Sequence, residues 1–247
     1  MIAFNSYIKR FINYEKYKFK FSFSSHRRHF VNQKLNYILS VNFKVMSSTL
    51  RAATNLEPAD VKNVMKFNFY SSYLKVSRYK FYFIVRDPYK RLESFYRDKF
   101  YAHPNENDET RSDWQFGQLL VLESLGHKAD KNDPSLKVKL LAVTFSEVVS
   151  LLPKINLIEA HLTPQSNLLK YRFMKKDLKL KMERILKMEH KSDLNFLENE
   201  LKINLGVRIN QTRDLKVEIN YTKEDIDIIN SVYHEDFKLF SYEMKIL

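Results

Sequence analysis

The sequence predicts an α/β fold in which helices flank a central parallel sheet. Two short apolar segments, residues 37–41 and 81–85, are rich in residues that favour strands. Each is followed by a polar turn and then by a segment that can form a helix. Strands that alternate with helices are typical of parallel sheets, and 247 residues can bury a sizeable core, so a single α/β domain is the simplest arrangement.

The loop after the first expected strand has the composition of an anion-binding site. It begins at Asn42, carries Lys44, and leads into an expected helix over residues 50–56. It ends in three small hydroxyl residues: Ser47, Ser48 and Thr49. At the start of a helix the backbone N–H groups lack partners and the helix dipole is positive. This order of strand, polar loop and helix therefore predicts a phosphate-binding loop.

The second expected strand ends directly in Arg86. The Asp87-Pro88 pair then opens a helix that is expected to run to about Phe100. Ligands of open α/β sheets bind beyond the carboxyl ends of the strands, and a guanidinium group can bind a phosphate through two hydrogen bonds. Arg86 is therefore placed to bind an anion, although an arginine at a strand end can equally pair with the carboxyl end of a helix.

Five further elements are expected along the rest of the chain: a helix over 114–125, a short helix from Thr144 to about Pro153, a strand over 185–188, a helix capped by Ser192 that ends before Gly206, and a last helix that begins at a capping box of Thr222 and Asp225. The last helix carries apolar residues at helical spacing: Ile226, Ile229, Tyr233, Phe237 and Phe240. We expect residues 35–247 to form a single domain, preceded by a basic and aromatic N-terminal extension over residues 1–34.

The composition excludes several classes of site. The chain has no cysteine, which excludes disulfides, cysteine-based zinc sites and a thiol nucleophile. Its glycines are Gly117, Gly126 and Gly206, so neither G-x-G-x-x-G nor G-x-x-x-x-G-K-[ST] is present. A phosphate site must therefore be built without a glycine-rich loop.

The formal charge of +13 indicates a partner with many negative charges: a nucleic acid, an anionic membrane, a polyanionic sugar or a phosphorylated cofactor. A solvated lysine-rich surface is the simpler alternative. The segment from Tyr7 to Arg28 mixes aromatic and basic residues, and it could either rest on an anionic membrane or pack on the domain. It lacks the unbroken apolar core of a signal peptide or a membrane span.

Six spaced residues after the second strand resemble a known motif. The pattern R-D-P-x-x-R-x-x-S-x-Y is formed by Arg86, Asp87, Pro88, Arg91, Ser94 and Tyr96. It resembles the 3′-phosphate-binding motif of sulfotransferases. The resemblance implies that Arg86 and Ser94 hold the 3′-phosphate of 3′-phosphoadenosine 5′-phosphosulfate. Arg91, at a neighbouring position on the same helix face, is also expected to bind the donor.

The earlier loop resembles the 5′-phosphosulfate loop of the same family. Lys44 and the hydroxyl-rich turn match that loop, whereas Phe43 stands where a proline often precedes the lysine. The resemblance implies that the 5′ end of the donor is bound by six residues of this segment: Lys44, Val45, Ser47, Ser48, Thr49 and Leu50. No metal ion is expected.

Further segments resemble the carbohydrate sulfotransferases of the Golgi type and their bacterial relatives. In chain order they are residues 96–100, 144–147, 161–165 (the pattern H-x-x-P-Q), 185–189 and 233–240. The resemblance spans roughly residues 35–242. It implies a P-loop-like sulfotransferase fold and sulfuryl transfer to a carbohydrate hydroxyl. An anionic polysaccharide or glycolipid acceptor agrees with the positive charge better than a protein tyrosine, steroid or phenol does.

The Golgi enzymes carry an N-terminal membrane anchor and usually cysteines, and neither is found in this sequence. We therefore expect a cytoplasmic, bacterial-like member of the family. Its basic and aromatic N-terminal segment suggests peripheral contact with the inner face of the membrane.

The expected chemistry needs an electrophile and a base. Lys44 is expected to neutralise charge on the bridging oxygen as the nucleotide leaves. His161 is the best candidate for the base, because an imidazole with an ordinary pKa of about 6.5 can remove a proton at neutral pH. His161 could instead be a structural residue that orients Glu159 or its loop, and His103 and Glu57 are other candidates for the base.

Two other classes of function fit these residues less well. A protein that binds nucleic acid or a membrane surface without catalysis would also be basic and aromatic. The sequence contains no helix-turn-helix or RNA-recognition module, however, and no nucleic-acid partner is expected. A kinase or nucleotidase usually needs a glycine-rich loop or metal-binding carboxylates.

Overall fold

The computed structural model describes residues 28–32, 34–46, 49–50, 53, 80–101, 116–128, 133, 135–168, 171–173, 176–178, 182–206 and 218–246. These residues form two compact units, each with its own apolar core. The sheet unit contains the described residues within Tyr17–Asp87 and Gln165–Gln211, and the helical unit contains those within Pro88–Pro164 and Thr212–Leu247.

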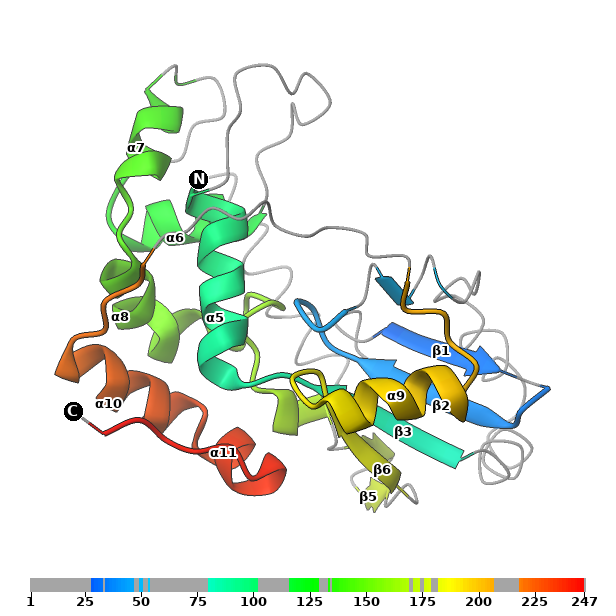
Figure 1. The fold of residues 1–247 in the computed structure, drawn as a ribbon. Coiled ribbons are helices and arrows are strands. Elements are labelled where there is room, and N and C mark those ends of the chain that lie inside the picture. Colours follow the sequence, from blue (N-terminus) through cyan, green and yellow to red (C-terminus); the bar gives the residue numbers. More distant parts are fainter. Residues whose placement is uncertain are drawn as a thin grey trace. The chain divides into compact units, whose positions relative to one another are not determined.

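The sheet unit is built on four strands in the order β1-β2-β3-β6. Their bounds are Arg28–Asn32 for β1, Tyr37–Val41 for β2, Lys80–Val85 for β3 and Met182–Lys187 for β6. Strands β2, β3 and β6 run parallel, and β1 pairs antiparallel with β2 at one edge (Figure 1). The prediction of an α/β fold on a parallel sheet is confirmed. The strand expected over 185–188 begins earlier, at Met182, and ends at Lys187.

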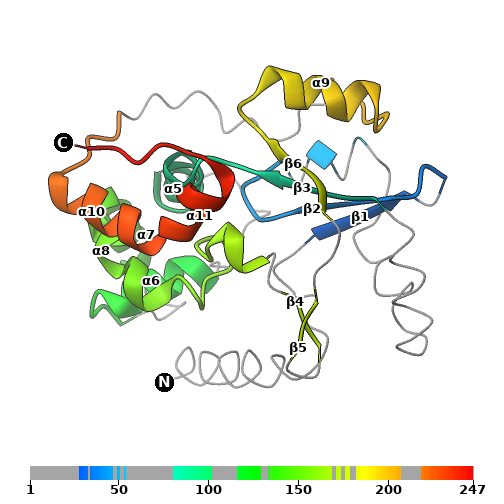
Figure 2. The same cartoon turned by 90° about the horizontal axis from the view of Figure 1, so that it is seen from below.

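Strands β2 and β3 are apolar, and side chains on both of their faces are buried. All five residues of β2 are buried, as are the last five of β3. One face packs against α9 (Lys191–Asn199) and the segment after it, where Leu197, Leu201 and Ile203 are at most 4 % exposed. Helix α9 lies along this face of the sheet (Figures 1 and 2). Strands that are covered on both faces have continuous apolar sequences, which is why these strands could be predicted from the sequence.

Three features of the sheet unit differ from the expected elements. Residues 28–32, expected in the N-terminal extension, form β1, and the Phe30 side chain is fully buried in the core of the unit. The short strands β4 (Tyr171–Phe173) and β5 (Lys176–Leu178) form an antiparallel pair that was not expected. Helix α9 starts after His190 rather than at a Ser192 cap, and it ends at Asn199.

The helical unit contains most of the described helices. They are α5 (Pro88–Tyr96), the π-helical turn η1 (Arg97–Tyr101), α6 (Phe116–Ser124), α7 (Leu136–Ala142), α8 (Phe145–Ile155), α10 (Lys223–Val232) and α11 (His234–Phe240). Helix α8 packs against α5, α6 and α10. A capping box at Thr144 opens α8, with hydrogen bonds to and from Glu147. The helix it opens continues through Pro153 to Ile155, two residues beyond its expected end.

The expected last helix is divided in two. The capping box of Thr222 and Asp225 is confirmed, and the five apolar residues of its predicted face are each at most 3 % exposed. At Tyr233, however, the backbone leaves helical geometry and separates α10 from α11. The Tyr233 hydroxyl donates a hydrogen bond of 2.8 Å to the carbonyl of Leu162, so this residue is held by a contact distant in the sequence.

The helix opened by Pro88 also differs from the simple expectation. It is α-helical to Tyr96 and then turns into the π-helical residues Arg97–Tyr101. Single π-helical turns are rare and often occur near functional residues. Of the helices that the structure describes, none has the length and apolar character needed to cross a membrane.

Candidate active site

The loop after β2 has the predicted order of strand, loop and helix. The Val45 side chain is fully buried and anchors the loop in the core of the sheet unit. Thr49 and Leu50 are helical, and the Leu50 N–H donates a hydrogen bond of 2.9 Å to the carbonyl of Met46. Ser47 and Ser48 lie outside the described residues.

The same loop has a strained backbone. Lys44 and Met46 have φ values of 63° and 50°, in the left-handed region that residues other than glycine rarely adopt. Each residue in this conformation lowers the free energy of unfolding by on the order of 1–3 kcal/mol, so the conformation is kept only where the surrounding structure imposes it. Here the buried Val45 lies between the two, and the Asn42 side chain accepts a hydrogen bond of 2.7 Å from the N–H of Phe43. Such strain clusters at ligand-binding loops, which supports the predicted role of this segment.

Arg86 meets this loop at the carboxyl ends of the parallel strands. Its Nη1 donates a hydrogen bond of 3.0 Å to the carbonyl of Lys44. Because β2 and β3 are parallel neighbours, the residues that follow them leave the sheet at the same edge. The structure therefore brings together two predicted site residues that are 42 positions apart in the chain.

Gln165 fixes the backbone of Arg86. Its side-chain Oε1 accepts a hydrogen bond of 3.0 Å from the Arg86 N–H, and its Nε2 donates one of 2.7 Å to the Arg86 carbonyl. The Gln165 side chain is fully buried. Next to it, the Glu189 carboxylate accepts a hydrogen bond of 3.1 Å from the N–H of Asp87. The sequence identified Gln165 as part of the H-x-x-P-Q segment but did not reveal this function.

In the helical unit, Arg91 points into the core. It is 1 % exposed, its Nη2 donates a hydrogen bond of 2.7 Å to the carbonyl of Thr163, and its guanidinium lies 5.6 Å from the centre of the Tyr233 ring. Its Nη1 has no hydrogen-bond partner among the described residues. Ser94 lies on the same helix and is partly exposed. These contacts show Arg91 supporting the turn that contains His161, while binding of the donor by Arg91 and Ser94 stays a prediction.

His161 forms a close pair with a buried carboxylate. Its Nδ1 lies 2.5 Å from Oε1 of Glu159, and its backbone N–H donates a hydrogen bond of 3.1 Å to the same oxygen. The side chain of Glu159 is 5 % exposed and that of His161 is 23 % exposed. Burial alone would raise the pKa of the Glu159 carboxyl. Its hydrogen bonds to His161, the charge of that ring and the charge of Lys99 outweigh burial and hold the pKa below its usual value.

The two units thus carry different chemical groups. In the sheet unit, Lys44 and Arg86 follow the carboxyl ends of β2 and β3, and an ammonium and a guanidinium group suit an anionic ligand. The helical unit presents an imidazole paired with a carboxylate, which suits proton transfer. The other candidate bases, His103 and Glu57, lie outside the described residues. Within the described ranges, no group of three or more His, Asp or Glu side chains could hold a metal ion, and chemistry without a metal stays a prediction.

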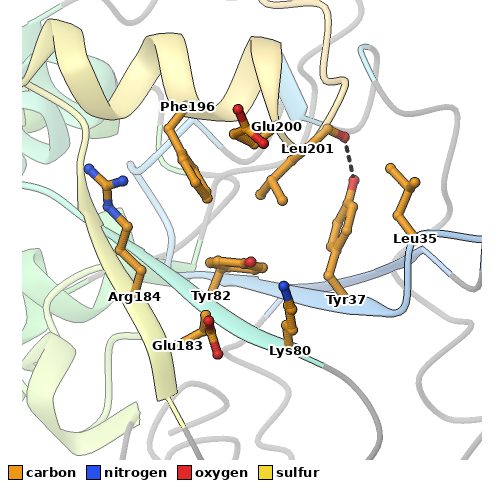
Figure 3. A pocket seen from close by; sticks show the side chains of 9 residues that line it. All are labelled: Leu35, Tyr37, Lys80, Tyr82, Glu183, Arg184, Phe196, Glu200 and Leu201. Carbon is orange, nitrogen blue, oxygen red and sulfur yellow. Dashed lines mark hydrogen bonds between the residues drawn. The ribbon is translucent and has the colours of Figure 1, made fainter.

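A hollow of about 330 Å³ lies at the opposite ends of the same strands, where β2 and β3 begin (Figure 3). Its lining includes Tyr37 and Lys80, the first residues of β2 and β3, whereas Lys44 and Arg86 follow the last residues of these strands. Burial and the charges of Glu183 and Glu200 raise the pKa of Tyr82, which also lines it. The hollow is therefore separate from the predicted donor loop.

A model of the sulfotransferase family matches residues 3–243 of the chain. Comparison with curated proteins and with solved structures gave no match. The matched range includes both predicted phosphate-binding segments, Lys44–Leu50 and Arg86–Tyr96, as well as the pair of Glu159 and His161.

Proposed function

The chain belongs to the sulfotransferase family, and we propose that it transfers the sulfuryl group of 3′-phosphoadenosine 5′-phosphosulfate to a hydroxyl of a carbohydrate. The observation that carries this proposal is the hydrogen bond between Arg86 and the Lys44 carbonyl at the carboxyl edge of the sheet. It places a guanidinium group beside a strained, lysine-bearing loop that leads into a helix. Such an edge suits a ligand with several phosphate groups.

The donor is proposed to bind through its two charged ends. The 5′-phosphosulfate is assigned to Lys44, Val45, Ser47, Ser48, Thr49 and Leu50, as the resemblance of this loop implies. The 3′-phosphate is assigned to Arg86 and Ser94, and Arg91 on the same helix is also proposed to bind the donor. The fixed backbone of Arg86 favours a defined position of its side chain, because Gln165 bonds both its N–H and its carbonyl.

The reaction needs an in-line displacement at sulfur. The acceptor hydroxyl oxygen attacks the sulfur, the bond between sulfur and the bridging phosphate oxygen breaks, and adenosine 3′,5′-bisphosphate leaves. Lys44 is proposed to neutralise charge on that bridging oxygen. His161 is proposed to accept the proton of the hydroxyl on its Nε2, since Nδ1 faces Glu159.

Adenosine 3′,5′-bisphosphate should stabilise the protein against heat. At a concentration 100 times its Kd, a ligand of the folded state adds about 2.7 kcal/mol, which corresponds to a rise in Tm of about 5–10 °C for a chain of this size. Adenosine 5′-monophosphate, which lacks the 3′-phosphate, should give a clearly smaller rise at the same concentration. Equal shifts, or none, in a thermal unfolding experiment would contradict the proposed donor.

The acceptor is proposed to be an anionic polysaccharide or glycolipid, recruited by the basic surface with a contribution from the segment Tyr7 to Arg28. Exposed charges are screened beyond about 8 Å at physiological ionic strength. If about three acceptor charges are contacted, KM for the acceptor should rise roughly 20- to 40-fold between 50 and 200 mM salt, as polyelectrolyte binding does. KM for the donor should rise less.

A neutral glycan with the same backbone is the matched control, because its KM should hardly respond to salt. Deletion of the residues through Arg28 should flatten the response of the anionic acceptor. An anionic acceptor whose KM is indifferent to salt, or a better reaction with a small neutral phenol, would mean that the charge of +13 serves only as a solvated surface.

A further inference from the structure

The contact between Glu159 and His161 determines the proton positions on the imidazole ring. An ionised carboxylate can only accept hydrogen bonds, so the Nδ1 that faces Glu159 at 2.5 Å carries the proton. In the neutral ring, Nε2 then holds the lone pair that can accept a proton. Glu159 is ionised at neutral pH because its pKa lies below the usual value. The same carboxylate oxygen also accepts the N–H of His161, which fixes the backbone beneath the ring.

Glu159 is itself held by close packing against α6. A Cβ atom added to Gly117 would lie 2.8 Å from Oε2 and 3.1 Å from Cδ of Glu159, so a glycine at this position permits the carboxylate to approach. Gly117 is in the first turn of α6, where the helix dipole favours a negative charge. The ring of Phe95 lies 5.9 Å from that of His161, centre to centre, and contacts it from α5.

The turn between Glu159 and Pro164 is fixed from two further elements. Arg91 on α5 donates to the carbonyl of Thr163, and Tyr233 donates to the carbonyl of Leu162. Burial raises the pKa of Tyr233 to about 12, so its hydroxyl stays a donor throughout the physiological range. The Thr163 hydroxyl closes the turn with a hydrogen bond of 3.3 Å to the carbonyl of Glu159. An imidazole on such a braced turn keeps its orientation.

We propose that Glu159 is a positioning residue of the active site, which holds His161 in the Nδ1–H tautomer and stabilises its protonated form. This inference rests on the proposed sulfuryl transfer. In that reaction the proton of the acceptor hydroxyl moves to Nε2 while the oxygen–sulfur bond forms and the bond from sulfur to the bridging oxygen breaks. The imidazolium is then stabilised by the carboxylate at Nδ1, as in other catalytic pairs of histidine and carboxylate.

One further charge acts on this pair, and two act on the neighbouring Tyr233. Lys99 on η1 is 5 % exposed and its charge acts on Glu159. Arg91 on α5 and Asp236 on α11 are also buried, and both act on the neighbouring Tyr233. Replacement of Glu159 by glutamine changes one charge of this group and leaves the shape of the side chain nearly unchanged.

Glu159→Gln should lower kcat/KM about 10- to 100-fold, a part of the factor that a general base contributes. The carboxamide can donate to Nδ1 and so favours the tautomer in which Nε2 cannot accept a proton. The acid limb of the kcat/KM profile should also move to lower pH, because a negative charge beside the ring is lost. A carboxylate with a merely structural role would leave the acid limb where it is. Glu235→Gln, on the exposed face of α11, is the matched control and should change neither quantity.

Histidine nitrogen NMR tests the pair without catalysis. The His161 signals are assigned by their loss in His161→Asn. In the wild type they should show the Nδ1–H tautomer at neutral pH, and in Glu159→Gln the titration midpoint should fall. Gly117→Ala should also lower the titration midpoint of His161 and weaken its preference for the Nδ1–H tautomer, because the added methyl group displaces the Glu159 carboxylate. Alanine is otherwise the better helix former.

The outcomes separate this inference from the proposed function. An active wild type whose Glu159→Gln variant keeps its rate, acid limb and His161 midpoint overturns the positioning role and leaves sulfuryl transfer intact. A wild type that neither binds adenosine 3′,5′-bisphosphate nor transfers sulfate overturns the proposed function, and the catalytic use of the pair with it. Unchanged binding of this nucleotide by Glu159→Gln, together with the lower rate and shifted limb, supports the role.

Discussion

Replacement of Lys44 by alanine should lower kcat by a factor on the order of 10²–10³, while the affinity for adenosine 3′,5′-bisphosphate falls much less. The proposed role of the ammonium is to stabilise charge that develops on the bridging oxygen in the transition state. The bisphosphate has no sulfur–oxygen bond to break, so it cannot report that interaction. Steady-state kinetics and calorimetric titration of the same variant therefore separate the two effects.

The fold should tolerate this replacement. Alanine and lysine have the same backbone preferences at a φ of 63°, and the buried Val45 still anchors the loop. Lys202→Ala is a close control, because Lys202 is an exposed lysine of the same unit with a φ of 56°. It removes one positive charge at a similar backbone conformation. If kcat of Lys44→Ala stays within a factor of about three of the control, Lys44 is not the electrophile.

Replacement of Arg86 by alanine should weaken binding of adenosine 3′,5′-bisphosphate by about 2–4 kcal/mol, as expected when a charged hydrogen-bond partner is removed. This corresponds to a loss of affinity of roughly 30- to 1000-fold. Adenosine 5′-monophosphate should bind the variant and the wild type almost equally, because it lacks the phosphate that Arg86 is proposed to hold. Calorimetric titration with both nucleotides measures this difference.

The structure indicates that Arg86→Ala should remain folded. The two hydrogen bonds from Gln165 reach the backbone of Arg86 and survive removal of its side chain. The bond from Nη1 to the Lys44 carbonyl is lost, which should cost about 1 kcal/mol of unfolding free energy. Arg86→Lys keeps the charge without the planar fork and should bind with intermediate affinity. Equal losses for both nucleotides would place Arg86 elsewhere than at the 3′-phosphate.

Much of the framework could be predicted because its signals are local. The strands β2 and β3 are buried on both faces, so each appears as an unbroken apolar run. The capping box predicted at Thr222 involves residues only three positions apart and is confirmed, and the helix expected from Thr144 also starts there. Once β2 and β3 are taken as parallel neighbours, the loops that carry Lys44 and Arg86 must leave the sheet at one edge.

Other features depend on partners that no local pattern reveals. Helix α9 lacks the expected serine cap, and the last helix is divided at Tyr233, whose hydroxyl bonds a carbonyl 71 positions away. The strand β1 lies in a segment whose basic and aromatic composition suggested an extension. The pairing of Glu159 with His161 had one local sign, their separation of two residues, but the burial of Glu159 was not visible in it.

The sequence by itself determined the strands β2 and β3 with the loops that follow them, the helix starts at Thr144 and Thr222, and the choice of lysine, arginine and histidine at the candidate site. These follow from backbone preferences and from hydrophobic periodicity, which act over a few residues. Only the tertiary structure decided that Gln165 holds Arg86 across 79 positions, that Arg91 turns into the core, and that Gly117 makes room for Glu159. Those contacts depend on which buried polar groups meet once the chain has folded, and each such group must find its partner within the space that packing leaves.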